Sequence, residues 1–197
     1  SPIRLGQILR HQVQAGRRKV LIDVLDVDDL IDYDMPASTA PSAPPAANVD
    51  CSTAIAISNV EAVGYLLEVD TSGNGTDTSI GSSPPDLGGD GIAYHAAWWK
   101  YTPAGLGGEE GYVSTLGSSY DTVLSVWSVL TGDPCSTAAL VDLNDNFGIV
   151  NTSHIDLLDG GSPIWPLSPL YDYYFLVTGR TAGESGYLRF QFRSVPI

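Results

Sequence analysis

The fold is decided by the stretch Tyr187-Leu188-Arg189-Phe190-Gln191-Phe192-Arg193, near the end of the chain. Leu188, Phe190 and Phe192 alternate with side chains that have polar tips or charges. Because successive side chains of a strand point to opposite faces of a sheet, this stretch has one apolar face and one solvated face. It therefore predicts a β-strand that covers one side of a hydrophobic core.

Short apolar or alternating runs of the same kind recur upstream, and they are separated by breaks rich in Gly, Pro, Asp, Asn and Ser. The chain has 21 Gly and 13 Pro among 197 residues, which favours many turns and short strands. This spacing is typical of a sandwich or barrel. We predict about eight strands in an all-β domain over residues 48–197. The expected strands are 54–57, 62–69, 96–102, 111–115, 122–129, 149–157, 171–178 and 186–192.

Five blocks of this region resemble, in the right order, the bacterial pre-peptidase C-terminal type domain. The most specific block is STLGSSYDTVLSVW at residues 114–127, which is similar to the family signature S-T-x-G-S-x-F-D-T-x-L-x-V-Y. The others are the opening NVDCSTAIAI at 48–57, AWWKYTP at 97–103, LNDN at 143–146, and YYFLVTG at 173–179 with Gly186 downstream.

The resemblance covers residues 48–192 and implies a jelly-roll-like antiparallel β-sandwich. Such domains are usually appended to secreted bacterial hydrolases or surface proteins, where they have adhesive, targeting or folding roles and no catalysis. Similar modules occur in phage tail and other virion proteins. This sequence has a short charged arm in place of the usual upstream enzyme domain, which argues against a role as an accessory to a secreted enzyme.

Residues 1–34 form the predicted N-terminal arm. Five of the nine Lys and Arg residues lie in its first nineteen positions, where no acid occurs. Its apolar residues make a loose helical stripe, and so short an element is marginal when isolated in water. We expect the arm to bind a partner, and we favour another chain over the following domain. The expected contact residues are Ile3, Leu5, Ile8, Leu9, Arg10, Val13, Arg17 and Arg18.

Residues 35–47 form a linker rich in Pro, Ala and Ser, which should act as a semi-rigid extended spacer. The start of the chain, Ser1-Pro2-Ile3-Arg4, lacks the apolar region and cleavage site of a secretion signal. Either a signal was removed before the numbering begins, or the protein is never exported as a free chain. No stretch approaches the roughly 18 apolar residues of a membrane span.

The net charge is −14, and the sequence after the arm is strongly acidic. An acidic surface repels nucleic acids and anionic membranes. The basic part of the arm has no interleaved aromatic residues, so we expect no nucleic-acid partner and interpret it as a charged face that is either solvated or in contact with a partner.

Cys51 and Cys135 are the only cysteines. The family resemblance places both near strand ends, at positions where cysteines are common. A disulfide between them would close a separation of 84 residues (135 − 51) and stabilise the domain by roughly 4–5 kcal/mol. Two separate free thiols are the alternative. A structural zinc site would need further ligands.

Two further features suggest ligands. Asp142, Asn144 and Asp145 form an oxygen-rich stretch that could hold Ca²⁺, although an Asx-rich turn is the favoured interpretation because no EF-hand register is present. Trp98 and Trp99 are adjacent on an expected strand and so point to opposite faces. One of them should be core, and Trp99 is the candidate for an exposed ring that stacks on a glycan; burial beneath the arm or a neighbouring subunit is the alternative.

The sequence shows no catalytic pattern. Its three histidines lie far apart without HExxH spacing, there is no G-x-S-x-G elbow, and no pair of carboxylates stands out. We therefore predict a protein without enzymatic activity and without a cofactor, apart from the Ca²⁺ candidate.

Together these features predict a structural or adhesive component of a large extracellular assembly, with a phage virion as the leading interpretation. There it would be a capsid decoration or tail protein, homo-oligomeric, bound through its arm to other virion proteins and located in the virion. The alternative is a carbohydrate-binding or adhesion module of a bacterial secreted or cell-surface protein, with a surface glycan as ligand. A secreted hydrolase or its accessory domain is the third interpretation.

Overall fold

A computed structural model of the chain describes residues 47–59, 62, 64–77, 91–104, 109–146, 150–156 and 167–196. The chain divides into two units, Ser1–Thr39 and Ala40–Ile197, and every described residue belongs to the second. The predicted arm, and all of the predicted linker before Ala47, lie outside the described residues.

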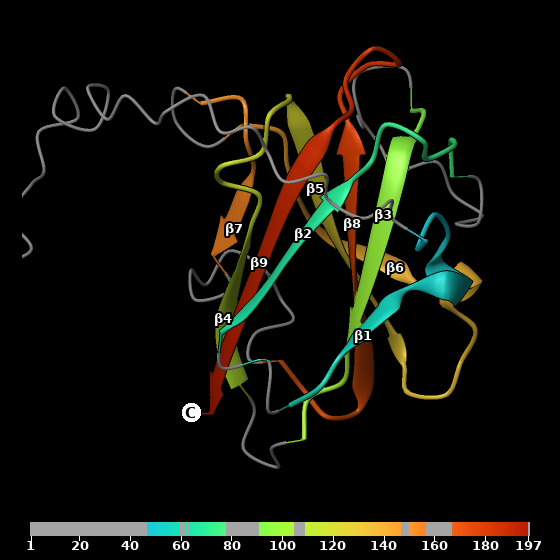
Figure 1. The fold of residues 1–197 in the computed structure, drawn as a ribbon. Helices are drawn as coiled ribbons and strands as arrows, with labels where there is room; N and C mark the ends of the chain where they lie inside the picture. The colour runs from blue at the N-terminus through green and yellow to red at the C-terminus, as the bar shows by residue number, and fades with distance from the viewer. Residues whose placement is uncertain are drawn as a thin grey trace, which may run out of the picture. The chain divides into compact units, whose positions relative to one another are not determined.

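The described residues form nine strands and two short 3-10 helices (Figure 1). In this part of the chain, no helix has the length and apolar character that are needed to cross a membrane. The strands are β1 (Ile55–Ile57), β2 (Tyr65–Asp70), β3 (Tyr94–Tyr101), β4 (Glu109–Ser114), β5 (Thr122–Leu130), β6 (Ala139–Asn144), β7 (His154–Asp156), β8 (Tyr171–Gly179) and β9 (Tyr187–Pro196), and the 3-10 helices are η2 (Cys51–Thr53) and η4 (Cys135–Thr137).

The strands make two sheets that lie face to face. One sheet has the order β1-β3-β8-β5-β6 and the other has the order β2-β9-β4-β7. All neighbouring strands are antiparallel except β1 and β3, which are parallel. The predicted all-β sandwich is confirmed, and each of the eight predicted strands overlaps an observed one.

The strand that the sequence analysis missed is β6, which pairs with β5 at an edge of the five-stranded sheet. Its sequence ends in Asp142-Leu143-Asn144, and we interpreted the polar residues Asp142 and Asn144 as part of a loop. An edge strand is solvated along one side and so tolerates polar and charged side chains. The local composition therefore predicted a turn, whereas pairing with β5 makes this segment a strand.

Aromatic contacts join the two sheets across the core. Trp99 on β3 stacks on Phe190 on β9, with ring centroids 3.9 Å apart and planes 3° from parallel. Phe175 on β8 lies 4.8 Å from Phe192 on β9, between ring centroids. Leu188 completes this face of β9, and all five side chains are buried. The alternation on which the sequence analysis began is therefore confirmed.

The five-stranded sheet is also buried on its other face. A second cluster there includes Trp98, Trp127 and Leu176, and it contains Cys51 from η2. Strands buried on both faces are apolar almost throughout, since neither set of alternating side chains meets water. This accounts for the unbroken burial of β8 after its first residue.

A buried carboxylate fastens the strand ends on one side of the sandwich. Glu109, at the start of β4, is 5% exposed. Its Oε2 atom accepts hydrogen bonds from the hydroxyls of Tyr101 and Ser194, and its Oε1 atom accepts one from the backbone N–H of Ala104 at 3.2 Å. A buried charge needs such donors, and here they tie β3, β4 and β9 together.

The Trp99–Phe190 stack yields a stability prediction. Trp99→Ala removes a fully buried ring and leaves a cavity, so the free energy of unfolding should fall by about 3–5 kcal/mol in urea denaturation. Leu66→Ala on β2 is the control, because Leu66 is 49% exposed and should cost little. Equal losses in the two variants would show that the stack does not hold the sheets together.

Candidate functional site

An open cleft of about 810 Å³ lies at one end of the sandwich. Its walls come from three segments that are far apart in the sequence: residues 116–121 between β4 and β5, residues 150–152 before β7, and residues 183–185 between β8 and β9. We call this hollow the loop-end cleft. Loops held by a rigid sheet are the usual place for binding residues.

Buried hydroxyl groups hold two of these segments together. The Oγ1 atoms of Thr115 and Thr122 lie 2.6 Å apart. The backbone N–H of Ser153 donates to Thr115 Oγ1 at 2.8 Å, and the N–H of Thr115 donates to the carbonyl of Ser153 at 2.9 Å. All three residues are buried. A satisfied network of this kind is rigid, so it fixes where both segments leave the sheet.

The segment between β4 and β5 is also tied to β9. Ser118 Oγ donates to the carbonyl of Thr115 at 2.7 Å and accepts from the backbone N–H of Arg189 at 3.0 Å. The N–H of Ser119 donates to the carbonyl of Tyr187 at 2.9 Å. The signature block at residues 114–127 therefore builds a fixed loop.

The turn between β8 and β9 forms the opposite wall. Its carbonyl at Glu184 approaches Gly179 so closely that a Cβ on Gly179 would lie 1.9 Å from that oxygen. Only glycine fits there. The Glu184 carboxylate accepts from the backbone N–H of Thr181 at 2.8 Å, which fixes this side chain in the turn.

The cleft is electrostatically negative. Asp121 and Glu184 line it, and no Lys or Arg does so among the described residues. Burial raises the pKa of the Asp121 carboxyl, the charges of Glu184 and Asp145 raise it further, and Arg180 opposes them. Arg180 pairs with Asp145 at 2.5 Å. The Oδ1 atom of Asp121 is hidden from water and has no hydrogen-bond partner in the described part of the chain.

Each of the three residues of the calcium candidate has another partner in the structure. Asp142 and Asn144 lie on β6, so the predicted single loop is wrong. Asp142 Oδ1 accepts from the backbone N–H of Leu143 at 2.7 Å, Asn144 Oδ1 accepts from the N–H of His154 at 3.2 Å, and Asp145 holds Arg180. Over the described ranges, no three His, Cys, Asp or Glu side chains gather as metal ligands do.

The prediction that Trp99 is an exposed glycan platform is wrong. Trp99 and Trp98 are both 0% exposed. They do point to opposite faces of β3, but both faces are covered. The indole N–H of Trp98 donates to Asp77 at 2.7 Å, and the ring of Trp99 lies against Phe190.

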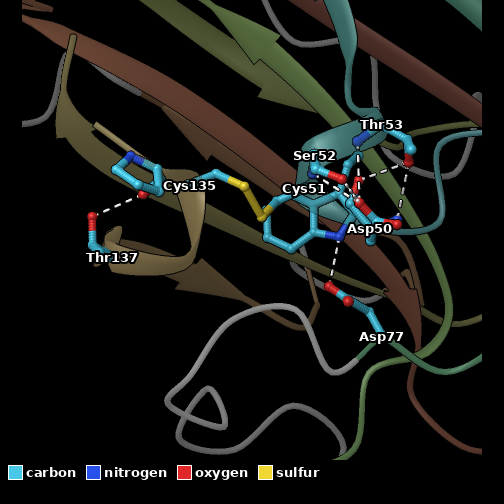
Figure 2. Close-up of a disulfide and its surroundings, with 9 residues drawn as sticks. Asp50, Cys51, Ser52, Thr53, Asp77, Cys135 and Thr137 are labelled. Atoms are coloured by element: carbon cyan, nitrogen blue, oxygen red, sulfur yellow. Dashed lines mark hydrogen bonds between the residues drawn. A yellow bond between two sulfur atoms is a disulfide. The ribbon is translucent and has the colours of Figure 1, made fainter. Parts of the chain in front are cut away.

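Cys51 and Cys135 form a disulfide, with Cα atoms 6.0 Å apart, so they are not two free thiols. Figure 2 shows the bridge between the 3-10 turns η2 and η4. The Asp50 carboxylate caps η2 by accepting from the backbone N–H groups of Ser52 and Thr53 at 2.8 and 3.1 Å. The hydrogen bond from the Ser52 hydroxyl is the largest cause that lowers the pKa of Asp50, and both N–H groups add to it.

Sequence reasoning missed one signal for this bridge and did not locate the cleft. The tetrapeptide Cys-Ser-Thr-Ala occurs twice, at residues 51–54 and 135–138, and each copy forms a 3-10 turn that leads into a strand. Half of the twelve cleft residues are Ser, Gly or Asp, which locally indicate only turns. The block at 114–127 marked one wall of the cleft but not its partners.

The predicted contact residues of the arm lie outside the described residues. They are Ile3, Leu5, Ile8, Leu9, Arg10, Val13, Arg17 and Arg18.

The two sheets and the bridge between η2 and η4 define a disulfide-bonded β-sandwich. Structural disulfides are typical of proteins outside the reducing cytoplasm. No family model and no curated protein matches the chain. The chain is similar to a crystal structure of PliG from Aeromonas hydrophila, a periplasmic inhibitor of g-type lysozyme, at 14% identity, with 76% of this chain and 100% of that chain covered and a TM-score of 0.38. A likeness of that size carries no argument here, and the resemblance to the pre-peptidase C-terminal type domain stays a prediction.

Removing the disulfide should destabilise the domain. The double variant Cys51→Ser, Cys135→Ser should lose about 4–5 kcal/mol of unfolding free energy, because the unfolded chain gains the entropy of an open loop. Urea denaturation measures the loss, and the native protein in dithiothreitol is the matched control. Two titratable thiols in the unreduced, denatured protein would contradict the bridge.

An ion pair lies near the disulfide and joins the adjacent strands β3 and β8. Lys100 Nζ lies 2.6 Å from Asp172 Oδ2, and the hydroxyl of Thr102 donates to Asp172 Oδ1 at 2.6 Å. Burial raises the pKa of Asp172, but the hydrogen bonds from Lys100 and Thr102 and the charge of Lys100 outweigh it and hold that pKa below its ordinary value.

The pair predicts an acid-sensitive part of the stability. Because the pKa of Asp172 is lower in the folded state, its ionised form adds stability above the unfolded pKa of about 3.9, and this is lost as the pH falls through the folded pKa. Asp172→Asn should lower the free energy of unfolding by about 1–3 kcal/mol near neutral pH. The difference from the native protein should shrink below about pH 4 in urea titrations. A difference that grows on acidification would contradict the assignment.

Proposed function

We propose that the protein is a non-enzymatic structural and adhesive component of a large extracytoplasmic assembly. In this proposal the N-terminal arm is the anchor, the linker is a spacer, and the sandwich is displayed at the surface. Its specific form is a phage virion protein, either a capsid decoration or a tail component, present in several copies and bound through the arm to other virion proteins.

The observation that carries the proposal is the way in which the chain is fastened where it joins the sandwich. The side chain of Asn48 donates to the carbonyl of Trp98 at 2.5 Å, and the N–H of Trp98 donates to the carbonyl of Asn48 at 2.9 Å. Three residues later, Cys51 is bonded to Cys135. The first strand, β1, is an edge strand of three residues and would separate easily under tension.

Because of the Asn48–Trp98 hydrogen bonds and the disulfide, a force applied to the linker is not borne by β1. Asn48 passes it to β3, next to the centre of the five-stranded sheet, and the disulfide passes it to the turn before β6. Such a junction would stabilise a domain that is displayed on a tether. The geometry therefore supports an anchored domain, and the basic, acid-free start of the arm supports an anchor that contacts protein.

A carbohydrate-binding or adhesion module of a bacterial secreted or cell-surface protein is the second candidate. The disulfide favours it, because structural disulfides form and persist in secreted and surface proteins. A virion component would acquire the bond after release from the reducing cytoplasm of its host. Detecting the bridge in protein purified from intact particles or from cell envelopes separates the two candidates.

The arm is tested by comparing the full chain with a truncated protein that begins at Ala47, which keeps Asn48 and its contacts. We expect light scattering to show oligomers for the full chain and monomers for the truncated one, with equal unfolding midpoints. A full chain with Arg17→Glu and Arg18→Glu is the matched control for charge, and it should also lose assembly. If the full chain is also a monomer, the arm is not an element of self-assembly.

A further inference from the structure

We propose that the loop-end cleft is a binding site for a neutral saccharide of one or two sugar rings. The inference rests on the adhesive part of the proposed function and gives it a place and a ligand class. The cleft volume of about 810 Å³ lies within the range of about 300–1,000 Å³ that is usual for small-molecule sites.

The cleft is preorganised, which a site on three separate loops requires. The network of Thr115, Thr122 and Ser153 joins two of its walls, and both serines of the first wall are bonded to β9. The third wall is held by the close approach of Glu184 to Gly179. Walls fixed before binding lose little conformational entropy when a ligand arrives.

The acceptors in the cleft call for a ligand rich in hydroxyl donors. An ionised carboxylate can only accept hydrogen bonds. Glu184 uses its Oε2 atom for the N–H of Thr181, which leaves its Oε1 atom as an acceptor in the cleft. Neighbouring hydroxyls of a sugar ring would supply donors to this oxygen, whereas Asp121 Oδ1 is hidden from water and contributes only its charge.

The rest of the lining favours a neutral sugar over other ligands. Two carboxylates without a lining Lys or Arg among the described residues should repel phosphate, sulfate and acidic sugars. A bare cation could use the carboxylates, the exposed amide oxygen of Asn151 and the hydroxyl of Ser185, but not the apolar surface of Val150, which is 42% exposed. A sugar uses all of these, because its ring presents both hydroxyls and an apolar C–H face.

The test begins with the full chain on an array of neutral and acidic oligosaccharides. We expect binding to neutral glycans only, with affinity then measured by calorimetry against the best neutral oligosaccharide. Glu184→Gln and Asn151→Ala should each weaken that affinity at least tenfold with an unchanged unfolding midpoint. Glu110→Gln is the matched control, because Glu110 lies on β4 outside the cleft and should bind as the native protein does.

Three results would overturn the inference: no neutral glycan bound, neutral glycans bound equally well by Glu184→Gln and Asn151→Ala, or a cleft that takes Ca²⁺ or acidic glycans instead. Ca²⁺ binding in the cleft would appear as a shift of the unfolding midpoint when CaCl₂ is added. The Glu184→Gln variant would show no such shift. Loss of glycan binding in a chain that still assembles through its arm overturns this site alone. Loss of assembly with intact glycan binding overturns the anchored-component proposal alone.

Discussion

Burial of both faces of the five-stranded sheet is the constraint on which the rest of the structure depends. The inner face packs on the four-stranded sheet through Trp99 and Phe190. On the outer face, the described cover is short: η2, η4 and the cluster around Trp98. So little chain can shield that face only if it is held in place, because short 3-10 turns have little stability of their own. The disulfide between the turns supplies the restraint.

The same disulfide also stabilises the junction between the linker and the domain. Cys51 lies three residues after Asn48, which is hydrogen-bonded to Trp98, so the covering turn is also where the chain joins the domain. Core protection and attachment thus share one set of contacts. A change that loosens η2 would expose the outer face of the sheet and weaken the junction with the linker together.

The polar groups at the ends of the strands follow a different rule. Where Thr115, Thr122 and Ser153 are buried, their hydroxyls satisfy one another and the neighbouring backbone, as buried polar groups must. This satisfaction makes the loops above them rigid. The loop-end cleft is therefore a by-product of good packing below it.

The sequence by itself determined the fold class and most strands, because side chains alternate with a period of two and the alternation of residues 187–193 is visible locally. It also placed Trp98 and Trp99 on opposite faces, but whether either face meets water depends on what covers the sheet, so the exposed Trp99 was wrong. The edge strand β6 was missed because its polar residues Asp142 and Asn144 indicate a turn locally, whereas pairing with β5 makes them part of a strand. Asp121, Asn151 and Glu184 share a cleft only because β5 pairs with β8 and the loops at that end converge. Tertiary pairing alone decided the site, since contacts between residues so far apart leave no pattern in the sequence near each of them.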